Sequence, residues 1–114
     1  MEVTDQYELT ALHRALFEAQ FAVAPHDRDV PGSPLLAALS NRVVDELTKI
    51  DPRWADWRAA ENHPERIAIA RKHLLGNPRW PTMSKAERID HVRNQLAPLV
   101  PSEDLVASII GDAV

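Results

Sequence analysis

Tryptophan and arginine occur together in two copies of the pattern Asx-Pro-Arg-Trp, and they are the residues of this chain best suited to binding. The first copy lies in DPRWADW (51–57) and the second in NPRWPTM (77–83). Both residue types are enriched at interface hot spots because they bury a large area and carry directional donors. A Trp beside an Arg can also stack on an anionic aromatic ligand. The candidate partner-binding residues are therefore Arg53, Trp54, Trp57, Arg58, Arg79 and Trp80. The alternative is that these large rings fill the core.

Histidine is the only other residue type whose number suggests a site. None of the five histidines lies four residues from another, so the two-histidine spacing of a helical zinc site is missing. Glu87 and His91 would share a helix face, and His26, Asp27 and Asp29 form a small cluster in a loop. Two ligands on a helix face are common by chance, and the loop lacks the further oxygen ligands and central glycine of a calcium site. We therefore expect neither a metal nor a cofactor.

The residues needed for covalent catalysis are also missing. The chain has no cysteine and no Gly-x-Ser-x-Gly pattern, and its three glycines are too far apart for a phosphate-binding loop. The paired carboxylates Asp45-Glu46 and Glu103-Asp104 are adjacent in sequence, so on a helix they point about 100° apart. No set of catalytic residues is predicted, which disfavours an enzyme.

The net charge of −4 is unevenly distributed along the chain. Residues 1–50 carry −4, residues 51–93 carry +3, and residues 94–114 carry −3. Both Trp-Arg stretches thus fall in the positive segment, which could form a basic face for an anionic partner. Alternatively, the acidic flanks pack against it and offset its charge. The last two expected helices have the outline of a helix-turn-helix, but the second offers only acidic charges, which disfavours nucleic acid as a partner.

Helical spacing of apolar residues and helix-capping residues predict the elements. A first helix is expected from about Asp5 to Val23, capped by Thr4 and stopped by Pro25. Ser33-Pro34 should begin a second helix. Its apolar stripe consists of Leu36, Leu39, Val43, Leu47 and Ile50. Further helices are expected over about 52–61, from Pro64 to a left-handed cap at Gly76, from the capping box Ser84–Glu87 to near Pro98, and from Ser102 to Gly111.

Proline also distinguishes the two Asx-Pro-Arg-Trp copies. Asp51-Pro52 should start a helix that carries Trp54 and Trp57. In the second copy, Pro81 would remove an amide that a helix needs and would push Trp80 out of the α region. The second copy is therefore predicted to be an extended turn.

These patterns predict an all-α fold: a single domain, 1–114, of five or six short to medium helices in an irregular, orthogonal bundle with proline-capped corners. The first residues lack the features of a signal peptide, and no run of 18 apolar residues occurs, so the expected location is cytoplasmic. Ten Arg against three Lys suggests a GC-rich, bacterial source.

The leading hypothesis for function is a non-enzymatic helical interaction module, such as an accessory subunit, adaptor or inhibitor. It would dock another protein chain through the basic Trp/Arg segment. Two alternatives remain open: a helical domain that binds a small molecule, and an accessory subunit of an enzyme whose site another chain completes. Association with a second copy of the chain also stays open.

Overall fold

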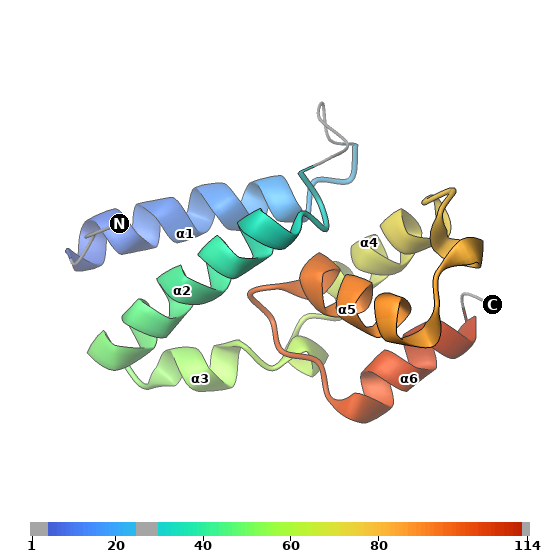
Figure 1. The fold of residues 1–114 in the computed structure, drawn as a ribbon. Coiled ribbons are helices and arrows are strands. Elements are labelled where there is room, and N and C mark those ends of the chain that lie inside the picture. The colour runs from blue at the N-terminus through green and yellow to red at the C-terminus, as the bar shows by residue number, and fades with distance from the viewer. Residues whose placement is uncertain (1–4, 25–29, 113–114) are drawn as a thin grey trace.

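The computed structural model describes residues 5–24 and 30–112, and these residues form six α-helices and no β-strand (Figure 1). The α-helices are α1 (Gln6–Gln20), α2 (Pro34–Ile50), α3 (Arg53–Trp57), α4 (Pro64–Leu75), α5 (Lys85–Leu96) and α6 (Glu103–Asp112). Two short 3-10 helices are η1 (Ala60–Asn62) and η2 (Trp80–Thr82). The predicted all-α fold is confirmed.

Helices α2, α4 and α5 begin at the predicted residues. Proline occupies the first turn of α2 and of α4, where a missing amide hydrogen breaks no helical bond. The Ser33 hydroxyl accepts a hydrogen bond from the Leu36 amide at 3.4 Å. Ser84 and Glu87 form the predicted capping box, in which each side chain accepts from the other residue's amide at 3.2 Å.

The first helix differs from its prediction at both ends. Its cap is Asp5, whose carboxylate accepts hydrogen bonds from two first-turn amides, because these have no partner within the helix. Thr4 and Pro25, the predicted cap and stop, lie outside the described residues. The helix ends at Gln20, three residues before its predicted end at Val23. Val23 is exposed.

The helix expected over 52–61 is broken because a distant segment pairs with its backbone. Ala59 is extended, with φ −60° and ψ 116°. The Val100 amide donates to the Arg58 carbonyl at 2.7 Å, and the Ala60 amide donates to the Val100 carbonyl at 3.0 Å. These tertiary bonds interrupt the helix, leaving α3 and the separate turn η1.

Three further predictions of local conformation were wrong. Gly76 has a φ of −79° and is not a left-handed cap, while α6 continues through Gly111 to Asp112. The segment after Pro78 is also not extended, because Trp80 begins the 3-10 helix η2. A 3-10 helix tolerates Pro81 in its first turn, where the missing amide hydrogen is not needed.

The helices form two groups in space (Figure 1). Helices α1 and α2 lie side by side and antiparallel, with α3 next to α2, whereas α4, α5 and α6 pack together at the other end. No helix among the described residues is both long and apolar enough to cross a membrane.

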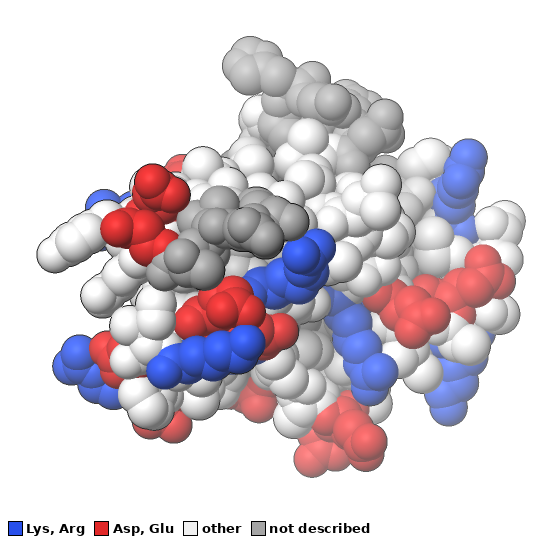
Figure 2. Space-filling model, turned by 60° about the vertical axis from the view of Figure 1, so that its left-hand side comes forward, with Lys and Arg blue, Asp and Glu red and all other residues white. Residues whose placement is uncertain are grey.

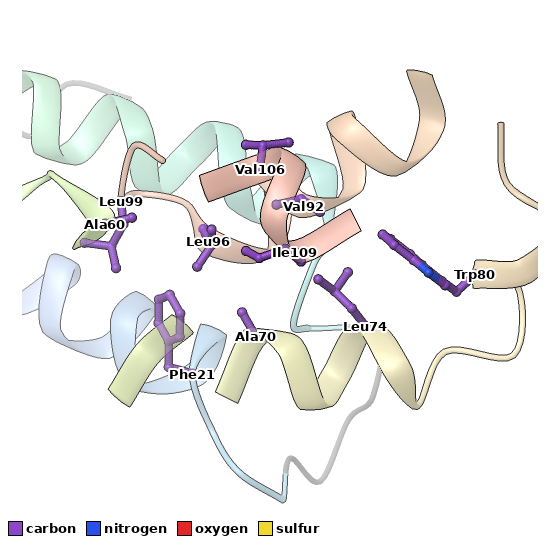
Figure 3. Close-up of a cluster of buried hydrophobic side chains, with 10 residues drawn as sticks. All are labelled: Phe21, Ala60, Ala70, Leu74, Trp80, Val92, Leu96, Leu99, Val106 and Ile109. Atoms are coloured by element: carbon purple, nitrogen blue, oxygen red, sulfur yellow. The ribbon is translucent and has the colours of Figure 1, made fainter. Parts of the chain in front are cut away.

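The core follows the same division. A large cluster joins the C-terminal end of α1 to α4, α5 and α6 (Figure 3). Its buried members are Phe21, Ala60, Ala70, Leu74, Trp80, Val92, Leu96, Leu99, Val106 and Ile109. A smaller cluster of Leu9, Val43 and Leu47 joins α1 to α2. In the predicted stripe on α2, Val43 and Leu47 are buried and Leu39 packs against them, whereas Leu36 is half-buried outside both clusters and Ile50 is 45% exposed.

Charged side chains of both signs are mixed at the surface. On the face shown in Figure 2, Lys and Arg lie beside Asp and Glu and form no extended basic area. Arg58 of the positive segment pairs with Asp45 of the negative N-terminal segment. This contact agrees with the alternative interpretation of the charge pattern, in which the acidic flanks pack against the basic middle segment and offset its charge.

Candidate partner-binding site around helix α3

The two groups of predicted binding residues lie far apart. Arg53, Trp54, Trp57 and Arg58 belong to α3 and its C-terminal cap, whereas Arg79 and Trp80 lie at the turn between α4 and α5. Figure 1 shows these regions at opposite ends of the molecule. The six residues therefore do not form one surface, and α3 is the better candidate site.

The tryptophans of α3 pack on α1 around a histidine that sequence reasoning did not single out. The His13 ring makes edge contacts with Trp54 and Trp57, with centroid distances of 5.0 and 4.9 Å, and a tilted contact with Phe17 at 5.4 Å. Both tryptophans are half-buried, so part of each ring reaches solvent. The opposite side of α3 remains available for other contacts.

His13 is 7% exposed, and no described residue forms a hydrogen bond with its ring. Burial lowers its pKa below the ordinary value of 6.5, and the neighbouring Arg14 lowers it further. Burying an ion without a partner costs several kcal/mol, whereas a cation–π contact with the indoles returns about 2 kcal/mol. Desolvation therefore prevails, and His13 is neutral at pH 7.

Arg58 anchors the C-terminal end of α3 to two other parts of the chain. Its guanidinium donates to the Asp45 carboxylate and, at 3.0 Å, to the Asn41 side-chain oxygen on α2. Its Nε donates to the Pro98 carbonyl at 3.0 Å. Only 16% of the side chain is exposed. Arg58 thus stabilises the fold, and each of its three guanidinium nitrogens donates one hydrogen bond within the protein.

Next to this anchor, α2, α3 and the segment 97–101 enclose an open groove of about 550 Å³. The residues that line it are Asp45, Thr48, Lys49, Ala55, Arg58, Ala59 and Val100. Its floor is apolar, formed by two alanines and by Val100, which is 55% exposed. On α2, Asp45, Thr48 and Lys49 lie at i, i+3 and i+4, a spacing that places the three side chains on one helix face.

The polar side chains of the groove already have partners inside the protein. The Thr48 hydroxyl donates to the Val44 carbonyl at 2.7 Å, and Lys49 pairs with Glu46 at 2.8 Å. Asp45 holds Arg58. The groove therefore presents apolar surface between paired charges, and no catalytic arrangement of side chains is evident in it.

The second Trp-Arg copy contributes to the core. Trp80 is 3% exposed, the Arg88 guanidinium lies 5.3 Å from its ring centre, and His91 packs at 6.4 Å. Arg79 is exposed, but the neighbouring Trp80 is buried and cannot contact another protein in this conformation. The alternative reading, in which large rings fill the core, therefore holds for Trp80.

Two of the candidate metal residues, Glu87 and His91, have partners within the protein. The Glu87 carboxylate caps α5, and His91 bonds to Asn77 through its Nε2 at 3.1 Å. No three of His, Asp and Glu among the described residues are placed to hold a metal ion. The cluster of His26, Asp27 and Asp29 lies outside the described residues.

Among the residues that line the groove, sequence reasoning selected only Arg58 as a binding residue, because the others are individually unremarkable. The floor depends on Val100, which pairs with the backbone around Ala59 from 41 residues away. The spacing of Asp45, Thr48 and Lys49 marks a helix face, but nothing local indicates which element lies opposite it.

Comparison of the chain with protein families, with curated proteins and with solved structures finds no match.

Proposed function

We propose that the protein is a non-enzymatic interaction module that docks a segment of a partner protein in the groove between α2, α3 and residues 97–101. The observation that carries the proposal is the exposed apolar floor formed by Ala55, Ala59 and Val100, bordered by charged side chains. Protein interfaces share this arrangement of an apolar centre and a polar rim.

The rim indicates the chemistry of the partner. Asp45 and Lys49 lie one helical turn apart on α2, and both are more than half exposed although each has an internal ion-pair partner. A complementary segment would place one aliphatic or aromatic side chain on the floor. It would carry a basic group toward Asp45 and an acidic group toward Lys49.

A small molecule fits the groove less well. Ligand pockets bury most of the ligand and direct a few free polar groups toward it. Here the groove is open, so it would leave much of a small ligand in contact with water. These features support a protein segment as the occupant.

Selection from a random peptide library displayed on phage tests the proposal. The wild-type protein is the target, and the affinity of each selected peptide is then measured by isothermal titration calorimetry with wild type and with Ala55→Gln. Ala55 is exposed, so the long neutral side chain should fill the groove without disturbing the core. We expect selected peptides to carry an apolar residue between opposite charges and to bind the variant at least ten-fold more weakly.

Ala68→Gln is the matched control, because Ala68 is an exposed alanine on α4 that does not line the groove. Its affinity for the selected peptides should equal that of wild type. Selection of no peptide, or of peptides that bind wild type and Ala55→Gln equally, would overturn the proposal.

A further inference from the structure

His13 lies against helix α3, so a change in the charge of its ring would affect that helix. Its ring contacts Phe17 on its own helix and the two tryptophans of α3, so it lies between α1 and α3. It is more than nine-tenths buried, and no hydrogen bond from a described residue fixes either ring nitrogen. A proton taken up here would face mainly aromatic rings, and no described residue offers a hydrogen-bond acceptor to it.

The charged groups around His13 offer no compensation. On α1, the adjacent Arg14 is a cation, and across Phe17 the Arg66 guanidinium lies 4.7 Å from that ring's centre. His63 also packs against Phe17, at 6.4 Å between ring centroids. On α3, Arg53 and Asp56 are both exposed. No carboxylate of α1 or α3 thus contacts the His13 ring.

Helix α3 makes different contacts at its C-terminal end and along its length. At its C-terminal end, Arg58 bonds to α2 and to the segment 97–100 through both side chain and backbone. Along its length, Trp54 and Trp57 contact the aromatic rings of His13 and Phe17 on α1, and Trp54 also packs against the small cluster between α1 and α2. The helix has only five residues, so few hydrogen bonds within it oppose its local unfolding.

We propose that His13 is a pH-sensitive switch: when its imidazole takes up a proton from solvent, the Trp54–Trp57 face of α3 separates from α1 while Arg58 keeps the end of α3 in place. The structural reason is that an imidazolium needs water or an acceptor, and moving away from the indoles provides it. The proposal goes beyond the docking function and does not depend on what occupies the groove.

The test follows the folded wild-type protein by NMR between pH 7.5 and pH 4.5. Imidazole signals give the His13 titration, and the indole N–H signals report the surroundings of Trp54 and Trp57. Amide hydrogen exchange, corrected for its intrinsic pH dependence, reports helix α3. We expect both indole signals to shift with the His13 midpoint, and the protection of the Arg58 amide to fall at least ten-fold, while protection in α5 stays constant.

Two variants assign the event to His13. His13→Phe keeps an aromatic ring without a titrating group, and the indole shifts and the loss of protection should disappear. His63→Gln should leave both in place, although His63 bonds to the Trp57 carbonyl at 2.6 Å. The wild-type titration alone decides the matter if His13→Phe fails to fold.

Three results would overturn the proposal. The first is that His13 titrates with no change at either indole. The second is that protection is lost in α3 and α5 together, which is global unfolding. The third is that the change depends on His63 and not on His13.

Discussion

The two Asx-Pro-Arg-Trp copies make the same turn but end in different environments. In each, the Asx side chain accepts a hydrogen bond from the Arg amide two residues later, at 3.0 Å from Asp51 and at 2.9 Å from Asn77. In each, the Trp amide donates to the Asx carbonyl, at 3.2 and 3.1 Å. The repeated letters therefore encode a local turn of the kind that Asx-Pro favours.

The copies diverge after the tryptophan. The first continues with Ala55 into α3, whereas the second meets Pro81 and forms only η2. Trp54 packs beside the small cluster between α1 and α2 and stays half-buried, while Trp80 enters the large cluster and is buried. Burial of the shared Arg-Trp pair thus depends on the elements that surround it, and only the first copy keeps its tryptophan partly exposed.

The largest expected difference between the copies lies in the tryptophans. Trp80→Ala should destabilise the protein by about 3–5 kcal/mol, because it leaves a cavity in the large cluster. Trp54→Ala should cost clearly less, since part of that ring is already in contact with water. Urea unfolding followed by circular dichroism gives both values. Equal losses would show that the two tryptophans are equally important to the core.

The next largest effect should come from the anchor that only the first copy possesses. Arg58→Met removes the bonds to Asn41, Asp45 and the Pro98 carbonyl, so the free energy of unfolding should fall by about 1–3 kcal/mol. Arg79→Met is the comparison, because Arg79 is exposed and should change stability by less than about 0.5 kcal/mol. Denaturant unfolding measures both, and similar losses would contradict the assigned role of Arg58.

A smaller difference is expected at the Asx positions. Asn77→Ala loses two bonds, one from the Arg79 amide and one to His91, and should cost about 1–2 kcal/mol. Asp51→Ala should cost less free energy of unfolding. The Asp51 side chain bonds only to Arg53, through its amide and its exposed guanidinium. Thermal unfolding of both variants gives the order, and the reverse order would show that the Asp51–Arg53 pair matters more than its exposure implies.

The last prediction concerns the histidine beside each copy. Burial lowers the pKa of His13 and of His91 below 6.5, so the unfolded chain binds more protons than the folded one below that pH. The contribution of these two histidines to the free energy of unfolding should be fully present above pH 6.5. It should decline as the pH falls from 6.5 toward the folded-state pKa of each histidine. Unfolding measured at several pH values tests the sign, and the combined substitutions His13→Phe and His91→Gln should flatten the decline. A decline that persists unchanged would assign it to other groups.

Local chemistry explains how much of the fold could be read from the sequence. Ser33-Pro34 and the Ser84–Glu87 box fix helix starts through bonds within a few residues, so their positions were predictable. The break in 52–61 was not, because it follows from the pairing of Val100 with the backbone around Ala59. The groove depends on the same distant contact and was missed for the same reason.

The site residues show the same limit. The sequence indicated Trp54, Trp57 and Trp80 as either core or surface, and only packing could separate them. His13 gave no signal at all, since its unusual environment comes from rings that lie more than 40 residues away in the chain.

The sequence by itself determined the helical class and most helix starts, because these depend on hydrogen bonds and apolar spacing within a few residues. The tertiary structure alone decided which tryptophan is buried, where α3 ends, and that Arg58 serves as an anchor. Those outcomes depend on contacts between segments far apart in the chain, and no local pattern specifies which segments meet.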